Sequence, residues 1–313
     1  MTTLRIGTRG SPLALAQAND VRARLIAAHG LEGSQVTLRV IKTTGDAIQD
    51  RPLSEAGGKG LFTKEIEEAL IAGEIDLAVH SMKDVPTVLP DGLFISTILE
   101  REDVRDAFIS LKYASLEAMP AGSIVGTSSL RRQAQVRRAR PDLKVIEFRG
   151  NVETRLRKIA DGVADATFLA MAGLNRLGLP ARATSAIETA TMLPAVAQGA
   201  VGIEIRASDA KTAALLAPLN HAPSAICVAA ERAFLAKLEG SCRTPIAGLA
   251  RLSGGRISFR GAILSPDGRE CLETSREGAP ADAAALGHDA GVELLGRAGP
   301  HFFAVVHGAT TRS

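Results

Sequence analysis

The sequence contains no tryptophan, one tyrosine and only 3% aromatic residues. Proteins that bind single-stranded nucleic acid stack the bases on aromatic side chains, so this composition argues against that function. Lysine and arginine (37) nearly balance aspartate and glutamate (34), and the net charge is only +3. The whole chain is therefore not a binder of polyanions, and any basic function has to come from local clustering.

Cysteine is also scarce, with three residues in 313. An odd number without paired spacing does not indicate a disulfide framework and favours a reducing compartment. The chain has no CxxC or HExxH motif, so we expect no metal site. No uncharged apolar stretch approaches the ~20 residues that a membrane-spanning helix needs, so we expect no membrane span. Arg9 and Pro12 interrupt the only segment that could imitate a signal peptide, which predicts a cytoplasmic protein.

Short strands alternate with helices at the start of the chain. Residues 4–8, 36–41 and 75–79 predict strands, because they are apolar or β-branched runs too short for helices. Ser11 followed by Pro12 is typical of a helix start, and Gly30 of its end. Residues 62–71 predict a second helix, and the glycine-containing residues 42–60 predict a mobile loop. This alternation predicts a mostly parallel sheet with helices on both faces.

Two short patterns recur along the chain. IGT at 6–8, followed by a helix that starts at serine, is similar to VGT at 125–127, followed by SSL. GEID at 73–76 and GVAD at 162–165 each precede an apolar strand. Chance and internal duplication are both compatible with these similarities. A duplication would give two similar α/β lobes whose helix N-termini face one cleft and favour anions there.

The last third of the chain has a different pattern. Residues 222–238 predict a helix that ends near Gly240, and Cys242 follows directly. Residues 245–274 contain three strand-like runs separated by the turn signals SGG and PDG, and 281–297 predict an alanine-rich helix. We interpret this part as a small α+β domain that carries the cysteine.

The strongest local bias is basic. Residues 131–158 hold ten lysines and arginines against three acidic residues, a net charge of +7. Arginine dominates, and its planar guanidinium suits bidentate binding of carboxylates or phosphates. A solvated helix face, a nucleic-acid surface and a site for a substrate with several carboxylates are the possible interpretations, and low aromatic content argues against the second. Arg131, Arg132 and Arg149 are expected to line a cleft, and the arginines at 137, 138 and 140 to face solvent.

Three segments carry other reactive residue types. HSMKDVP at 80–86 places Lys83 and Asp84 just after a buried strand, a position for acid–base chemistry or for a purely structural turn. Cys242 precedes an arginine in a predicted loop, which could lower the pKa of its thiol and make it nucleophilic, although an unreactive cysteine is the commoner outcome of such a pattern. Lys59, within GGKG at 57–60, does not belong to a phosphate-binding loop, because glycine follows it where serine or threonine is needed. We interpret that segment as a flexible lid with one cation.

The other two cysteines, Cys227 and Cys271, fit buried positions in a helix and a strand.

These segments resemble, in order, the motifs of the porphobilinogen deaminase family, from residue 4 to about residue 250. The motifs are RGSPLA (9–14), GKGLF (58–62), VHSMKDVP (79–86), ERED (100–103), GTSSLRR (126–132), RGNV (149–152) with Arg155, QG (198–199) and GSCRTP (240–245). HSMKDVP and GTSSLRR are the most specific. Ser241 departs from the family pattern, in which many members have a second glycine.

The resemblance implies an α/β fold with two periplasmic-binding-protein-like lobes plus a small α+β C-terminal domain. Domain 1 would comprise residues 1–97 and 197–218, with Asp84 and the loop 42–60. Domain 2, the arginine-rich lobe, would comprise 98–196, and domain 3, with Cys242, would comprise 219–313. The resemblance also implies a monomer.

The function implied is that of a transferase in porphyrin, tetrapyrrole and heme biosynthesis. It would deaminate porphobilinogen, join four such pyrroles head to tail on a dipyrromethane cofactor, and release hydroxymethylbilane by hydrolysis. The cofactor would be bound to Cys242 through a thioether, and Asp84 would be the catalytic carboxylate. The side chains expected to bind carboxylates of cofactor and substrate are Arg9, Ser11, Lys59, Lys83, Thr127, Ser128, Ser129, Arg131, Arg132, Arg149, Asn151, Arg155, Arg176 and Gln198.

Two other functions compete with this one. A non-enzymatic two-lobed binding protein for a polycarboxylate is the main alternative, and the cysteine-bearing domain argues against it. A basic nucleic-acid regulator is the other, but the sequence contains no recognisable DNA-binding module. We therefore expect porphobilinogen as the partner molecule, with no nucleic acid and no membrane.

Overall fold

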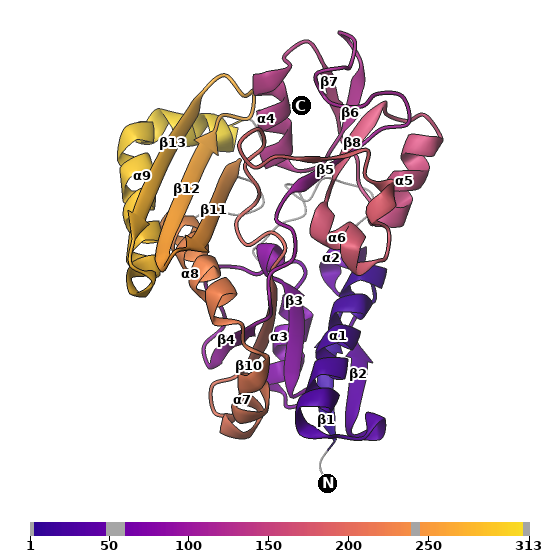
Figure 1. Ribbon diagram of the computed structural model, residues 1–313, viewed down its shortest axis with the longest axis vertical. Coiled ribbons are helices and arrows are strands. Elements are labelled where there is room, and N and C mark those ends of the chain that lie inside the picture. Colours follow the sequence, from indigo (N-terminus) through magenta and orange to yellow (C-terminus); the bar gives the residue numbers. More distant parts are fainter. Residues whose placement is uncertain (1–2, 48–59, 239–244, 309–313) are drawn as a thin grey trace. The chain divides into compact units, whose positions relative to one another are not determined.

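The computed structural model describes residues 3–47, 60–238 and 245–308. Within these ranges the chain divides into two compact units. The first comprises residues 3–47, 60–102 and 199–225, and the second comprises 103–198, 226–238 and 245–308. Two five-stranded sheets and one three-stranded sheet form the framework (Figure 1).

The sheet of the first unit has the order β2-β1-β3-β10-β4. Three of its strands are parallel: β1 (Leu4–Thr8), β2 (Val36–Val40) and β3 (Leu77–Ser81). β10 (Val201–Arg206) runs antiparallel to β3 and to β4 (Leu93–Ile98). The helices of this unit are α1 (Pro12–His29), α2 (Thr44–Ala47), α3 (Lys64–Ile71) and α7 (Ala210–Leu216), with short 3-10 helices η1 (Gly33–Gln35), η2 (Met82–Asp84) and η4 (Ala217–Leu219).

Helix α1 forms where the sequence predicts it. Ser11 is the N-cap, and its Oγ accepts a hydrogen bond from the Ala14 N–H at 3.3 Å. Gly30 ends the helix in the left-handed conformation, with φ 60°. Val21 and Leu25 are fully buried and pack on the sheet, so the helix is fixed by one apolar face.

Other predicted boundaries in this unit shift by a few residues. β1 matches its prediction, whereas β3 begins at Leu77 instead of residue 75, because Ile75 packs under α3 in a core cluster before the strand starts. The predicted loop 42–60 contains a helical turn, α2, and residues 48–59 lie outside the described residues. This turn is stabilised by a 2.7 Å hydrogen bond from Gly45 N–H to Leu61 C=O, so the loop prediction was wrong at 44–47.

The arginine-rich part of the second unit has the sheet order β7-β6-β8-β5-β9. Its parallel strands are β6 (Ile124–Gly126), β7 (Lys144–Ile146) and β8 (Ala166–Ala170). β5 (Asp106–Ile109) runs antiparallel to β8 and to β9 (Ser185–Ile187). The helices are α4 (Leu130–Ala139), α5 (Val152–Ala160) and α6 (Met171–Arg176), with a 3-10 helix η3 (Pro180–Arg182).

The repeated sequence patterns take equivalent places in the two sheets. Asp76 accepts from the Arg5 N–H and donates its own N–H to the Arg5 C=O, at 2.8 and 2.9 Å. Asp165 makes the same pair of bonds with Ile124, both at 2.8 Å. Each aspartate follows a glycine with positive φ and precedes the third parallel strand. This correspondence favours internal duplication over chance.

The remaining sheet is an antiparallel meander of β11 (Ile246–Ser253), β12 (Arg256–Leu264) and β13 (Cys271–Gly278). It is accompanied by α8 (Ala222–Lys237) and α9 (Ala283–Gly308), which Figure 1 labels, and by the 3-10 helix η5 (Pro280–Asp282). Phe234 of α8 packs on Phe259 with ring centroids 5.0 Å apart. The expectation of two α/β lobes plus a small α+β C-terminal domain is confirmed.

The longest described helix, α9, has 26 residues and is interrupted at Gly299, whose φ is 64°. Within the described ranges, no single helix is both long and apolar enough to cross a membrane. One pair, Ala210–Leu219 with Ala222–Lys237, meets that requirement jointly but is bent by 109°.

A substitution at Gly126, the last residue of β6, tests how tightly the end of this strand is packed. A Cβ there would lie 2.5 Å from two ring atoms of Phe148, which is fully buried. We predict that Gly126→Ala lowers the free energy of unfolding by ~1–3 kcal/mol, as overpacking does. Gly296→Ala in α9 is the control, because its Cβ would meet nothing within 4 Å. Urea unfolding should show this control unchanged or stabilised by up to ~1 kcal/mol, and equal losses in both variants would contradict the account.

Candidate active site

The predicted residues of the first unit gather at one edge of its sheet. Arg9 and Ser11 directly follow β1, while Lys83 and Asp84 form η2 directly after β3. β1 and β3 are parallel neighbours, with Ile6 opposite Leu77. Their carboxyl ends therefore meet at the same edge, where ligands bind in α/β sheets.

The turn that presents Asp84 is firmly held. Met82 is 1% exposed, and its N–H donates to the Ala200 C=O at 3.0 Å. Gly202 leaves the space that Met82 fills, since a Cβ at Gly202 would lie 2.0 Å from the Met82 Sδ. Ser81, one residue earlier, exchanges hydrogen bonds with the buried side chain of Gln17 on α1. Asp84 itself is partly exposed, so its side chain is accessible at the end of a firmly packed turn.

A buried titratable cluster lies beneath this turn. His80 Nε2 is 3.0 Å from Glu204 Oε2, and both side chains are almost fully buried. Glu67 of α3 is also buried. Burial raises the pKa of its carboxyl, and the nearby charge of Glu204 adds to this rise. Ionisable side chains therefore lie inside the core that supports the Asp84 turn, and the motif HSMKDVP contributes His80 to them.

Arg9 lies over the aromatic ring of Phe62, with its guanidinium carbon 4.1 Å from the ring centroid. A cation over a ring face is attracted by the ring quadrupole, so Phe62 helps to orient Arg9. Phe62 belongs to the motif GKGLF, whose Lys59 lies outside the described residues. Cys242 lies outside them as well.

The loop between β6 and α4 has three hydroxyl groups that accept hydrogen bonds from main-chain N–H groups. Thr127 Oγ1 accepts from the Ser129 N–H at 3.2 Å, and Ser128 Oγ accepts from the Phe148 N–H at 3.2 Å. Ser129 is the N-cap of α4 and accepts from the Arg132 N–H at 3.4 Å. Each hydroxyl acts as an acceptor in these bonds and still has a hydrogen to donate to a carboxylate.

The other predicted side chains of the second unit follow the neighbouring strands. Arg149 and Asn151 lie between β7 and α5, and Asn151 caps α5 by accepting from the Thr154 N–H at 2.9 Å. Arg155 is on α5, and Arg176 ends α6, which follows β8. β7 and β8 flank β6 in parallel, so these side chains and the β6–α4 loop share one sheet edge.

Arg131 and Arg132 are not on the surface of a cleft, as the sequence suggested, but are each 5% exposed and bound to Asp106. Arg131 donates from Nη1 and Nη2 to the two carboxylate oxygens at 2.8 and 3.1 Å. Arg132 donates to Oδ1 from Nε and Nη2, at 2.9 and 2.6 Å. Although burial alone would raise the pKa of Asp106, the charges and hydrogen bonds of both arginines hold it well below its usual range.

This buried cluster keeps a surplus of positive charge, since one carboxylate faces two guanidinium groups. Gln198, predicted as a binding residue, also donates from Nε2 to Asp106 Oδ1 at 3.3 Å and to the Val104 C=O at 2.8 Å. Arg131 Nε is buried and has no hydrogen-bond partner among the described residues. This unpartnered N–H donor, next to a net positive charge, is suited to an anionic ligand such as a pyrrole carboxylate.

Asp106 is the functional residue that sequence reasoning missed. It is a single acidic residue at the start of an otherwise apolar run, Asp106–Ile109, and it is fully buried. A buried carboxylate requires a cationic partner, and an arginine-rich segment follows it in the sequence. That combination was the available signal.

Two of the three arginines expected to face solvent do not. Arg137 is half-buried and donates from Nη1 to the Pro266 C=O at 2.7 Å. Arg140 donates to three main-chain carbonyls and forms an ion pair with Asp142 at 2.6 Å. Main-chain carbonyls therefore hold both of these guanidinium groups, whereas Arg138 is exposed as predicted.

The cysteines within the described ranges lie in the predicted helix and strand, although only Cys227 is buried. Cys227 is buried in α8, and Cys271 begins β13 with a half-buried side chain. Desolvation raises the pKa of the Cys271 thiol, which makes a thiolate there less favourable. No group of three or more His, Cys, Asp or Glu side chains among the described residues could hold a metal ion.

Family models match nearly the whole chain. The model described as "Porphobilinogen deaminase, dipyromethane cofactor binding domain" matches residues 4–214. The one described as "Porphobilinogen deaminase, C-terminal domain" matches residues 225–296. The first match defines the class of protein as one with a domain that binds a dipyrromethane cofactor. Together the two matches show that the chain belongs to the porphobilinogen deaminase family.

Individual relatives agree with this assignment. The porphobilinogen deaminase of Paracoccus denitrificans is 61% identical over 300 residues, which cover 96% of each protein. That of Nitrobacter hamburgensis is 62% identical over 304 residues, covering 97% of this chain and 96% of the relative. The chloroplastic porphobilinogen deaminase of Pisum sativum is 57% identical, covering 96% of this chain and 83% of that protein. The resemblance seen in the sequence motifs is confirmed.

Solved structures give a distant likeness. The periplasmic VFT2 domain of BvgS from Bordetella pertussis has a TM-score of 0.40 at 15% identity, covering 69% of this chain and 84% of that one. Protein PG110 from Staphylococcus aureus has a TM-score of 0.41 at 14% identity, covering 70% and 87%.

Removing the charge of Asp106 should be costly. Asp106→Asn leaves two buried guanidiniums without a counter-charge, and we predict a loss of ~3–5 kcal/mol in the free energy of unfolding at neutral pH. The folded-state pKa of Asp106 is lowered. Its contribution is thus present above the unfolded pKa of ~3.9 and is lost as pH falls through the folded pKa. In denaturant unfolding, the difference in unfolding free energy between Asp106→Asn and wild type should therefore become smaller at acidic pH. The exposed control Asp161→Asn should differ from wild type by no more than ~0.5 kcal/mol at every pH. A gap independent of pH would refute this assignment.

Glu67 should show the opposite pH dependence, because its folded-state pKa is raised. The stability linked to such a group is present below the unfolded pKa of ~4.3 and is lost as pH rises through the folded pKa. Glu67→Gln removes this loss. We predict that the unfolding free energy of the variant improves relative to wild type as the pH rises above ~4.3. The exposed neighbour Glu68→Gln is the control, and the same trend in both would contradict the buried-cluster account.

Proposed function

We propose that this chain is a transferase that deaminates porphobilinogen, joins four of the pyrroles on a covalent dipyrromethane, and hydrolyses the product to hydroxymethylbilane. The observation that carries the proposal is the buried Asp106–Arg131–Arg132 cluster, with its surplus positive charge and its unpartnered donor, in a chain of this family. Porphobilinogen carries acetate and propionate groups, which such a cluster would bind. This function places the protein in porphyrin and heme biosynthesis.

Asp84 is the residue assigned to the chemistry. Its carboxylate is presented on a fixed turn and is partly exposed, so it can accept hydrogen bonds from pyrrole N–H groups. A fixed negative charge stabilises positive charge that develops on the substrate when ammonia leaves, without the cost of reorienting solvent. The same carboxylate can help to move a proton to the departing amine.

The basic and hydroxyl side chains are assigned to carboxylate binding. In the first unit these are Arg9, Ser11, Lys59 and Lys83; in the second they are Thr127, Ser128, Ser129, Arg131, Arg132, Arg149, Asn151, Arg155, Arg176 and Gln198. Each charged hydrogen bond contributes ~1.5–3 kcal/mol, which is enough to hold a product whose negative charge grows with every addition. Arginine suits this task because its donors match a carboxylate in pairs.

The dipyrromethane, bound through a thioether to Cys242, would supply a nucleophilic pyrrole carbon to which each new unit is joined. The residues that would hold its carboxylates are the arginines of the second unit, and the buried donor of Arg131 supports that fit. We further propose three domains with the bounds 1–97 plus 197–218, 98–196 and 219–313, and a monomeric protein of the cytoplasm. The three separate sheets support this division.

Replacing Asp84 tests the assignment of catalysis. We predict that Asp84→Asn lowers kcat at least ~100-fold, because an amide neither carries the charge nor exchanges a proton, while the cofactor stays attached. Steady-state turnover of porphobilinogen and the intact mass of the variant measure the two properties. The exposed Asp91→Asn is the matched control and should retain wild-type turnover.

Near-normal activity of Asp84→Asn would exclude the role of Asp84. Binding of porphobilinogen without turnover by the unaltered protein would instead favour a two-lobed binding protein for polycarboxylates.

A further inference from the structure

Helix α4 is shared between two cores of the second unit. Val136, on one face, is fully buried with Phe108 and Phe168 of the arginine-rich lobe. Ala134, on another face, is fully buried in a cluster with Ala247, Leu249, Ala262 and Leu264 of the three-stranded sheet. The helix that begins with Arg131 and Arg132 is therefore also the surface on which the C-terminal sheet packs.

The turn between β12 and β13 rests directly on the backbone of α4. Gly268 has φ 76°, and a Cβ there would lie 2.5 Å from the Ala134 carbonyl oxygen and 2.6 Å from the Arg138 nitrogen. No side chain fits between the turn and the helix without moving one of them. The turn is rigid in itself, since Ser265 Oγ donates to Asp267 at 2.5 Å and the Gly268 N–H donates to the Ser265 C=O at 2.9 Å.

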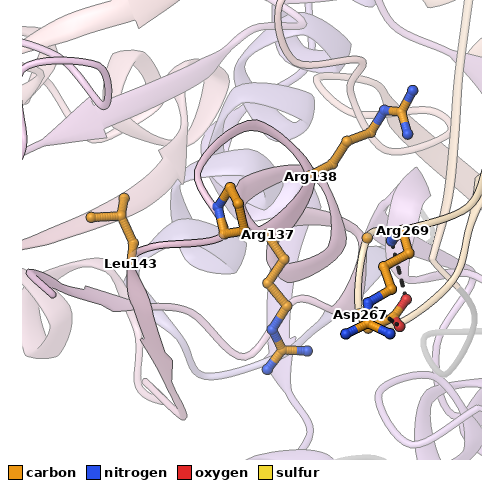
Figure 2. A pocket seen from close by; sticks show the side chains of 7 residues that line it. Arg137, Arg138, Leu143, Asp267 and Arg269 are labelled. Carbon is orange, nitrogen blue, oxygen red and sulfur yellow. Dashed lines mark hydrogen bonds and ion pairs between the residues drawn. The ribbon is translucent and has the colours of Figure 1, made fainter. Parts of the chain in front are cut away.

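Arg137 fastens the same contact by donating from Nη1 to the Pro266 C=O at 2.7 Å. Figure 2 shows that Arg137 and its neighbour Arg138 point in different directions from the helix, with Arg269 turned toward Asp267. These residues line a pocket of about 610 Å³ at the junction. Because the guanidinium groups diverge, the junction has the geometry of a docking contact and not of a site for one anion.

A few hydrogen bonds connect the contact between the turn 266–268 and α4 to the buried arginines. Gln135 of α4 binds both main-chain groups of Leu193, accepting from its N–H at 2.8 Å and donating to its C=O at 3.0 Å. Arg131 Nη1 donates to the same carbonyl at 2.8 Å. Leu193 belongs to the apolar cluster under the three-stranded sheet. A shift of α4 on that sheet therefore displaces a hydrogen-bond partner of Arg131.

We propose that the turn 266–268 is a positioning element for α4: docking of the C-terminal sheet onto the helix, through Gly268 and Arg137, sets the orientation of Arg131 and Arg132 toward the substrate carboxylates. The inference rests on the function proposed above. It makes Gly268 and Arg137 positioning residues that act through α4. It also means that the part of the chain assigned to the cofactor influences carboxylate binding by a mechanical contact.

The test compares two glycines with the same backbone conformation in the holoenzyme. Gly268→Ala adds a Cβ against the helix, whereas Gly255→Ala, with φ 71° and no atom within 4 Å of its Cβ, adds only the backbone strain. Amide hydrogen exchange of residues 130–135 and steady-state kinetics with porphobilinogen are measured for both. We expect faster exchange in α4 and a KM raised about tenfold, the effect of one misplaced charged hydrogen bond, for Gly268→Ala alone.

The kcat of Gly268→Ala should change much less than its KM, since Asp84 is untouched; a merely structural loss would lower the fraction of active protein and leave KM unchanged. Equal α4 exchange and equal KM in the two glycine variants would overturn the proposal.

A milder pair covers the case in which Gly268→Ala does not fold. Arg137→Ala removes the bond to Pro266, and the exposed Arg138→Ala removes a neighbouring guanidinium with no such bond. Faster amide exchange in α4 and a higher KM in Arg137→Ala, but not in Arg138→Ala, would support the positioning role of the turn 266–268. Equal exchange rates and equal KM values in the two variants would refute it. Absence of turnover in the unaltered holoenzyme would instead refute the proposed function. The amide-exchange measurement would still test whether the turn 266–268 holds α4 in place.

Discussion

The arginine-rich lobe depends on one buried carboxylate. Asp106 allows two guanidinium groups to lie inside the protein, where an unpaired charge would be strongly unfavourable. It neutralises only one of the two charges, so the lobe keeps a fixed positive surplus and a donor, Arg131 Nε, that faces no acceptor in the described chain. A site built in this way is oriented before any anion arrives, which reduces the ordering that binding requires.

The same topology serves both α/β lobes. In each, three parallel strands bring their carboxyl ends to one sheet edge, and short polar loops follow them. The first lobe has Asp84 there, on a turn packed by Met82 against Gly202, together with Arg9 and Lys83. The second lobe has arginines and hydroxyl groups there. Duplication of a lobe, followed by divergence of these polar loops, would account for the shared topology and for the carboxylate that only the first lobe contributes to the proposed chemistry.

The sequence predicted most of this framework because local signals and packing agree. Ser11, Pro12 and Gly30 delimit α1 correctly, and the turns after β11 and β12 follow the glycine signals. The pairing of Arg131 and Arg132 with Asp106 was not predicted. Asp106 is about 25 residues away, and the lone acidic residue in an apolar run shows only that a cationic partner is needed, not which arginine supplies it. Arg137 and Arg140 were misjudged for the same reason: their acceptors are main-chain carbonyls, which a sequence pattern does not mark. The roles assigned to Asp84 and the carboxylate-binding residues stay predictions.

Covalent attachment of a two-pyrrole cofactor at Cys242 is the central claim, because primer-dependent elongation requires it. The most direct measurement is the intact mass of the purified protein and of Cys242→Ser, each before and after incubation with porphobilinogen. The account predicts an excess mass of two linked pyrrole units in the unaltered protein, present at purification or acquired from porphobilinogen, and none in the variant. An unaltered protein that never acquires the adduct, or a variant that carries it, would contradict the account.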